Sequence, residues 1–231
     1  RREINLFPSL RILCSIAERV YTVHMDTRRR IIQCALRELD SEGLGGFSLR
    51  AVGSAAGLSA MAVYRHFKNK EDLLRAVGEE AFAAYQRRVA DIPDAPIQEW
   101  IRLVGREYVG FALDDPGRFE VCFVLQTQVE RIYPNDFRAG KSPVISLMVQ
   151  KIQAAQAAGQ LKSADALEVA LQLWALLHGM VMLHRSGRFS LNRSAFLALC
   201  DRACELIVNG LSCMRVQPVR ANKRTGNRRS R

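Results

Sequence analysis

With 231 residues, 48% of them hydrophobic and 25% charged, the chain can bury a substantial core and lacks the polar bias of a disordered segment. Its net charge of +11 favours an anionic partner. Its six cysteines lie in apolar helical patterns without the spacing of zinc ligands, which favours reduced structural thiols over a metal or redox site.

The sequence contains no convincing secretion signal or membrane span. Residues 4–20 include three charged side chains, which interrupt the apolar segment that a secretion signal needs. The longest apolar run, Val169–Leu183, contains Gln172 and His178 and falls short of the roughly 20 apolar residues that cross a bilayer. We therefore expect a soluble, cytoplasmic protein that does not associate with a membrane.

The two ends of the chain do not fit the pattern between them. Residues 1–24 have weak helical periodicity, and clean amphipathicity begins only after Met25. We interpret them as an N-terminal extension that is disordered or lies upstream of a natural start at Met25. Residues 213–231 form a basic tail, which we expect to be disordered. Seven basic residues and no acid between Arg215 and Arg231 account for most of the net charge.

The N-terminal domain begins with a helix predicted over Thr27–Glu42, where apolar residues recur every three or four positions. Glycine-rich residues 43–46 end this helix, and Ser48 is a suitable N-cap for the next one. Asn69 is placed in the same way to cap a long helix that leaves the domain. Between Met25 and Arg75 nine basic and six acidic residues leave a net charge of only +3. Any DNA-binding interpretation of this domain therefore rests on the spacing of its residues and not on its net charge.

The pattern between these caps is that of a helix-turn-helix. Gly57 stands just past the apolar residues of a helix over Leu49–Ala56, where a left-handed residue ends a helix. Ser59 follows and can cap a short helix, Ser59–Phe67. Two short helices held by a glycine-containing turn can place the second one in a DNA major groove.

The rest of the chain predicts further helices and no strand or repeat. After the long helix from Asn69, we expect helices over Ile97–Leu113, Arg118–Val129, Pro143–Ala158, Ala164–Arg185 and Ser194–Leu211, with a loop over 133–142. The predicted fold is all-α, with about nine helices. A three-helix helix-turn-helix domain over 25–74 precedes a helical ligand-binding and dimerisation bundle over 75–212.

The helix over Ala164–Arg185 is apolar on nearly all sides, so both of its faces must be covered. One face can pack on its own subunit, and the other packs most simply on a second subunit. The sequence thus predicts a homodimer formed through the last two long helices.

The residues of the helix-turn-helix resemble the signature of TetR-type transcriptional regulators. The matching pattern is Gly57-Leu-Ser-x-x-x-Val-Tyr64-x-His66-Phe67-x-Asn-Lys70-x-x-Leu73-Leu74, and the similarity covers about Arg28–Leu74. The resemblance implies a homodimer with an N-terminal DNA-binding domain and a divergent helical domain for a small-molecule effector. It further implies repression relieved by that effector, although some members of the family activate transcription.

The same resemblance implies roles for individual residues. Ser48, Tyr64 and Lys70 correspond to positions that contact phosphates, and Arg50 to one that can reach a base. Base edges would be read by residues of the second helix, and His66 is as suited to orienting the following turn as to touching DNA. The DNA-binding residues expected in this way are Ser48, Arg50, Ser59, Ala60, Met61, Ala62, Tyr64, Arg65, His66 and Lys70. The small and apolar reading face favours contacts to thymine methyls and readout of DNA shape.

The pattern Leu173-Trp174-x-x-x-His178-Gly179 looks like the tryptophan-histidine-glycine type of C-terminal domain found in part of this family. We expect His178 to fix helix packing and Gly179 to allow a close helix approach. An alternative places His178 in an effector pocket with Tyr108, Phe111 and Trp174. A metal site is disfavoured because Trp174, His178 and His184 supply too few ligands.

The leading interpretation is a sequence-specific DNA-binding regulator without a cofactor, which recognises a near-palindromic operator on double-stranded DNA as a homodimer. A helical enzyme with a vestigial helix-turn-helix is the rival, yet the sequence has no nucleophile elbow, phosphate-binding glycine loop or metal cluster. A third alternative is a nonspecific nucleic-acid-binding protein that relies on its basic tail. Deletion of residues 215–231 would separate this third alternative from the first.

Overall fold

The computed structural model describes the backbone of residues 8–125 and 131–213, and the side chains of these ranges from residue 25 onward. The basic tail from residue 214 onward lies outside the described residues. The helices are α1 (Pro8–Gly46), α2 (Leu49–Ala55), α3 (Ala60–Tyr64), α4 (Lys70–Ala90), α5 (Ile97–Asp114), α6 (Pro116–Phe123), α7 (Asn135–Arg138), α8 (Pro143–Ala157), α9 (Ala166–Arg185) and α10 (Arg193–Leu211). Across the described ranges the sole β-type pairing is an isolated bridge between Leu161 and Ser212, which confirms the all-α prediction.

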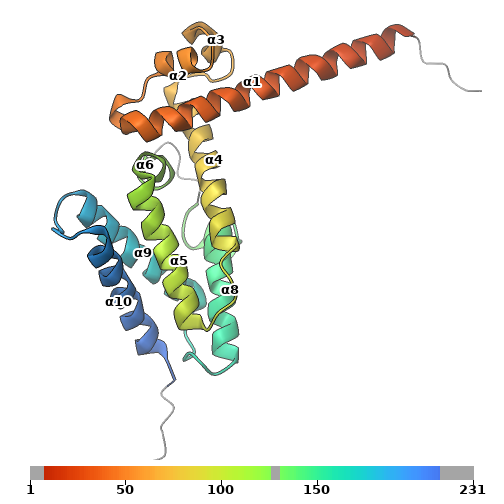
Figure 1. The fold of residues 1–231 in the computed structure, drawn as a ribbon. Coiled ribbons are helices and arrows are strands. Elements are labelled where there is room, and N and C mark those ends of the chain that lie inside the picture. Colours follow the sequence, from red (N-terminus) through yellow and green to blue (C-terminus); the bar gives the residue numbers. More distant parts are fainter. Residues whose placement is uncertain (1–7, 126–130, 214–231) are drawn as a thin grey trace, which may run out of the picture.

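The molecule has a small N-terminal head and a larger C-terminal bundle (Figure 1). In the head, α1 crosses beneath α2 and α3, and α4 descends from it into the bundle. The N-terminal core is made of apolar side chains from α1 to α4, among them Leu39, Val52, Val63 and Phe67. A second and larger core fills the space between α5, α8, α9 and α10. Each domain therefore has its own apolar centre, and α4 runs through both.

The short helix α6 packs against both domains. A Cβ added to its Gly117 would lie 2.7 Å from the carbonyl oxygen of Leu39 on α1, so only glycine allows this approach. Its Arg118 forms a two-bond ion pair with Asp40 of α1. Val121 belongs to the N-terminal core, whereas Phe119 is buried in the C-terminal core. A displacement of α6 would consequently change the packing of both cores.

Several helix boundaries differ from the predictions. α1 begins at Pro8 rather than Thr27, because the backbone of residues 8–24 continues the helix despite its weak periodicity. α3 ends at Tyr64 rather than Phe67, since the chain turns toward the Asn69 cap of α4. α6 ends at Phe123 rather than near residue 129, and 126–130 lie outside the described residues.

The described residues form ten helices rather than nine. The additional helix is α7, a single turn within the segment predicted to be a loop. The Asp136 carboxylate accepts a hydrogen bond from the backbone N–H of Ile132 at 2.8 Å and pairs with Lys141. These local contacts stabilise a turn too short to leave a periodic pattern in the sequence.

The helix α9 differs from expectation in two respects. By length and mean hydropathy alone it could cross a membrane, although its sequence was expected to fall short of a span. In the fold it is a core helix, because Leu173, Leu177 and Val181 on one of its faces are buried in the C-terminal core. Gly179 mediates no close approach to the other described residues, since a Cβ added there would meet none of their atoms within 4 Å. It lies on the opposite, exposed face.

Candidate DNA-binding surface and ligand cavity

The geometry of α2 and α3 is fixed by the caps that the sequence predicts. The Ser48 hydroxyl accepts a hydrogen bond from the N–H of Ala51, and the Ser59 hydroxyl accepts one from Ala62 at 3.2 Å. Gly57 adopts the left-handed conformation, with φ of 68°, and so turns the chain between the two helices. A Cβ added to Gly53 would lie 3.3 Å from Cγ2 of Val63 on α3, which shows how closely α2 approaches α3.

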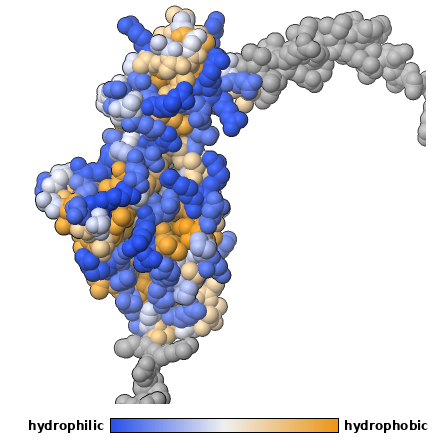
Figure 2. Space-filling view, viewed as in Figure 1, coloured by the Kyte–Doolittle hydropathy of each residue, from blue (hydrophilic) through white to orange (hydrophobic). Residues whose placement is uncertain are grey.

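The exposed front of α3 is apolar. The Met61 side chain is 75% exposed and Tyr64 is 48% exposed, whereas Val63 between them is fully buried. In Figure 2 the tip of the head, where α2 and α3 lie in Figure 1, is pale and orange with blue residues around it. An exposed methionine of this kind on a helix tip is suited to apolar contact with base edges.

One expected DNA-binding residue is misplaced by the sequence prediction. Ala62 is only 6% exposed, because α3 presents both Ala62 and Val63 to the N-terminal core. Ala62 therefore cannot form part of the exposed front. Ser59, Arg50 and Arg65 are exposed, and Ala60 and Ser48 are half-buried at the same end of the domain.

Two further expected residues have contacts within the protein. The Lys70 ammonium donates a hydrogen bond to the carbonyl oxygen of Phe47 at 2.9 Å. His66 is half-buried and likewise has an interaction within the protein. Asn69 caps α4 by accepting from the N–H of Asp72 at 2.8 Å. The hydrogen bond from the Lys68 N–H is the main reason why the pKa of the Asp72 carboxyl lies below its usual value, and the neighbouring Arg75 guanidinium lowers it further.

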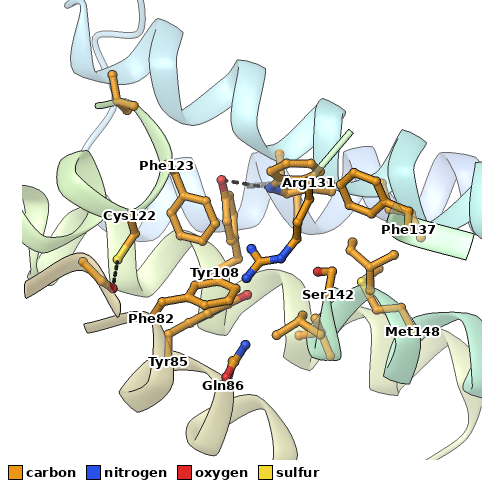
Figure 3. Close-up of a pocket in the computed structure, with 18 of the residues that line it drawn as sticks. Phe82, Tyr85, Gln86, Tyr108, Cys122, Phe123, Arg131, Phe137, Ser142 and Met148 are labelled. Atoms are coloured by element: carbon orange, nitrogen blue, oxygen red, sulfur yellow. Dashed lines mark hydrogen bonds between the residues drawn. The ribbon is translucent and has the colours of Figure 1, made fainter. Parts of the chain in front are cut away.

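A cavity of about 560 Å³ lies in the C-terminal bundle, within the size range of small-molecule sites. Its walls come from α4, α5, α6, α8 and α9 and from the segment around α7 (Figure 3). Several aromatic rings stand among the apolar side chains of these walls: the centroids of Phe82 and Phe123 are 5.7 Å apart, and those of Phe137 and Trp174 are 6.5 Å apart. A flat apolar molecule would find ring faces or edges on several sides.

The residues predicted to form an effector pocket divide into two pairs. Tyr108 and Trp174 line the cavity. Phe111 is buried behind it and stacks on Tyr85, with ring centroids 5.4 Å apart. His178 also lies behind the wall, where its Nδ1 is 2.8 Å from the Tyr108 hydroxyl. Both packing and pocket roles were open for His178, and the structure places it in contact with a lining residue.

A short hydrogen-bonded chain links these side chains. The Trp174 Nε1–H donates to the Tyr108 hydroxyl at 3.3 Å, and that hydroxyl can in turn donate to Nδ1 of His178. Burial lowers the pKa of His178 and so favours its neutral form, which retains an acceptor nitrogen. Burial also raises the pKa of Tyr108, which keeps its hydroxyl protonated. The chain therefore holds the Trp174 and Tyr108 side chains in fixed orientations on the cavity wall.

Several polar lining residues were not predicted from the sequence, among them Arg131, Ser142 and Gln86. The Arg131 guanidinium lies in the cavity 5.3 Å from the centroid of Phe82, and its Nε donates to the carbonyl oxygen of Lys141 at 2.8 Å. Ser142, at the entrance to α8, is only 6% exposed, and Gln86 reaches the cavity from α4. Arg131 and Ser142 flank α7 outside any long helix, so helical periodicity carried no signal for them.

The cysteines whose side chains the structure describes, which are all but Cys14, are free. Burial raises the pKa of Cys122 to about 12 and that of Cys200 to about 11, so both remain thiols at neutral pH. No group of three or more potential metal ligands occurs within the ranges that the structure covers.

Two family models match the chain, and together they cover both domains. Residues 31–77 match the model described as "Bacterial regulatory proteins, tetR family", which includes α2, α3 and the start of α4. Residues 101–207 match the model "Tetracyclin repressor-like, C-terminal domain". The second match includes α6 and α9, which carry Phe123 and Trp174 of the cavity wall.

Similar proteins agree with these matches. The chain is 39% identical over 54 residues to the HTH-type transcriptional regulator AcrR of Shigella flexneri, covering 23% of this chain and 25% of that protein. It is 31% identical over 72 residues to the tetracycline repressor class E of Escherichia coli, covering 31% of this chain and 34% of that protein. The matches thus span about a quarter to a third of these relatives. A solved structure from Rhodococcus sp. RHA1, of unknown function, superposes with a TM-score of 0.65 at 25% identity, over 81% of this chain and 96% of that one.

Proposed function

Because the chain belongs to the TetR family of bacterial regulatory proteins, we propose that it is a homodimeric regulator that binds operator DNA and is released by a small molecule. The observation that carries the proposal is the exposed tip of α3, capped by Ser59 and held against α2 at Gly53. As the operator-bound form would occlude transcription, the expected outcome is repression. The protein would act in the cytoplasm, where bacterial DNA is found.

DNA recognition would involve three kinds of contact. The N-terminus of α3 would enter the major groove, with Met61 against base edges. Arg50 and Arg65, both exposed, would reach bases or phosphates on either side. The Tyr64 hydroxyl would donate to a phosphate, and Lys70 would use the donors that its bond to Phe47 leaves free.

The dimer would form through α9 and α10. On their outer faces Leu183 is 47% exposed and Leu206 is 76% exposed. Gly179 lies on the outer face of α9 as well, and a partner helix could approach closely there. In Figure 2, orange residues are visible on the side of the bundle where Figure 1 shows these helices. Paired heads would then read half-sites about 34–36 Å apart, as expected for a near-palindromic operator.

The cavity would be coupled to the head through α4 and α6. Phe82 of α4 and Phe123 of α6 line the cavity, while Val77 and Val121 of the same helices lie in the N-terminal core. A ligand that displaced these two helices would alter the separation of the two heads in the dimer. The shift in DNA affinity is limited by the difference in ligand affinity between the two forms.

A gel mobility-shift assay on the DNA flanking the gene for this protein tests the proposal. We expect a sequence-specific, salt-sensitive complex at nanomolar to micromolar protein. Protein that lacks residues 215–231 should still form it, which would exclude a coating mechanism based on the tail. Loss of all sequence preference, or no complex with any flanking segment, would contradict the proposed function.

A further inference from the structure

Three consecutive arginines lie on α1 beside the helix-turn-helix. Arg28, Arg29 and Arg30 come directly before Ile31, the first α1 residue of the N-terminal core. Arg29 and Arg30 are exposed, and neither forms a hydrogen bond or an ion pair with a described residue. The match to the TetR-family DNA-binding model begins at residue 31, so the three arginines lie outside it.

Arg28 fixes the position of this turn of α1. Its guanidinium is 4.9 Å from the centroid of the Phe67 ring, within the range of a cation–π contact. Phe67 is buried in the segment that joins α3 to α4. The same segment contains Lys68, which is exposed, and it follows Tyr64, the proposed phosphate contact at the end of α3. The arginines thus continue the proposed DNA-binding surface from α3 onto α1.

The charge of this surface is positive. Residues 25–33 contain the three arginines and one acid, Asp26. Asp26 is exposed and lies one helical turn before Arg29 and Arg30, yet among the described residues it forms an ion pair with neither of them. Residues 68–72 carry two lysines and two acids and so leave this excess unchanged. A surface of this charge suits the phosphates of a nucleic acid.

The direction of α1 indicates which part of the DNA these residues would meet. In Figure 1, α1 leads away from the head on the side opposite α9 and α10, and its N-terminal end rises to the level of α3. In the proposed dimer, the partner subunit lies beyond α9 and α10. α1 therefore leads away from the centre of the operator, toward the base pairs outside each half-site.

We propose that Arg29 and Arg30 bind phosphates of the DNA that flanks each operator half-site, an inference that rests on the proposed regulatory function. Successive helix residues are about 100° apart, so the two side chains leave α1 on different sides of the Arg28 contact. Guanidinium groups bind phosphate oxygens through paired, charge-assisted hydrogen bonds. These contacts would strengthen binding without reading sequence, because phosphates carry no base information. The DNA that this protein covers would thus extend beyond its two half-sites.

Footprinting tests where the contacts lie. The mobility-shift assay on the DNA flanking the gene first locates the operator, and hydroxyl-radical footprinting with the full chain then records which parts of its backbone are protected. We expect protection to extend beyond the outer edge of each half-site. Arg29→Gln combined with Arg30→Gln should lose only this outer protection. Glutamine is a good helix former, so this variant should fold like the parent protein, which circular dichroism checks.

The salt dependence of binding counts the contacts. For each phosphate contact, the logarithm of the association constant falls by about 0.9 per unit of the logarithm of the salt concentration. With two arginines on each of two subunits, the double variant should reduce this slope by about 2 to about 4. It should also bind an operator extended by about 10 base pairs at each end at least about 10-fold more weakly. On DNA trimmed to the half-sites, variant and parent protein should bind alike.

The matched control combines Arg87→Gln with Arg188→Gln, which removes the same charge from exposed positions on the C-terminal bundle. It should keep the slope and the footprint of the parent protein. An unchanged slope in the α1 variant, an equal reduction in the control, or a parent footprint confined to the half-sites would overturn the inference while operator binding stands. A parent protein that binds no operator would contradict the regulatory function and this inference together, so the two kinds of failure are distinguishable.

Discussion

Lys70 connects the start of α4 to the end of the turn after α1. Its ammonium is 2.9 Å from the carbonyl oxygen of Phe47 and 5.4 Å from the centre of the Phe47 ring. Phe47 itself is buried in the N-terminal core. The lysine that the family resemblance assigned to a phosphate thus also anchors the entrance to α2.

Replacing Lys70 by methionine should therefore have two effects. The N-terminal domain should lose about 1 kcal/mol of unfolding free energy, the typical net contribution of such a hydrogen bond. DNA binding should weaken equally for all sequences, because a phosphate contact carries no sequence information. Urea unfolding and mobility shifts measure the two effects. An unchanged unfolding midpoint would show that the Phe47 contact adds no stability.

A second prediction contrasts Met61 with Tyr64 on α3. Met61→Ala should alter the preference among operator variants, with little change in stability, because the side chain is 75% exposed. Tyr64→Phe should weaken binding to every sequence by about fivefold, the loss of one hydrogen bond. Competition assays with single-base operator variants measure both. Arg188→Gln, an exposed change beyond the end of α9, is the control. A uniform loss with Met61→Ala would argue against base contact.

The dimer is tested through the exposed leucines of α9 and α10. Leu183→Lys combined with Leu206→Lys should convert the protein to a monomer, because each change would bury an unpaired charge in the interface. Sedimentation velocity measures the association state, and operator affinity should fall with it. Ile132→Lys changes an exposed apolar residue next to α7 and should leave the dimer intact. A double variant that remains dimeric would place the interface elsewhere.

The fourth prediction concerns pH. The pKa of His178 in the folded protein lies below its ordinary value of 6.5 because burial disfavours the imidazolium. The stability gained from its neutral form is complete above the unfolded pKa and is lost as pH falls through the lowered folded pKa. His178→Asn keeps an acceptor for Tyr108 without titrating in this range. Its unfolding midpoint should change less than that of the parent protein between about pH 7.5 and about pH 5.5. Parallel curves would contradict this role.

Local chemistry allowed much of the head to be predicted. Gly57, Ser48, Ser59 and Asn69 adopt the stop and cap roles that their residue types favour, since these roles depend on neighbours within a few positions. Ala62 was placed wrongly because the five-residue helix α3 is little more than one turn long, too short for its buried face to be read from periodicity.

The cavity could be predicted only in part, because it depends on contacts between distant segments. Tyr108 and Trp174 stood out as aromatic residues on long helices, and both line it. Arg131 and Ser142 are brought there by the path of the chain around α7, which tertiary packing determines. Gly179 was assigned to packing by its neighbours in sequence, yet it is Gly105 of α5 that lies close to α9, since a Cβ added there would be 3.3 Å from Cδ1 of Leu177.

The double role of α6 bears on how such a protein can diversify. Phe123 lines the cavity two residues after Val121 fills the N-terminal core, so mutations that reshape this wall also affect the head. Phe137 and Met148 line the opposite wall from α7 and α8 and belong to the C-terminal core alone. Selection for a new inducer, in nature or in the design of a biosensor, can therefore change residues of the α7–α8 wall with less disturbance of the DNA-binding head.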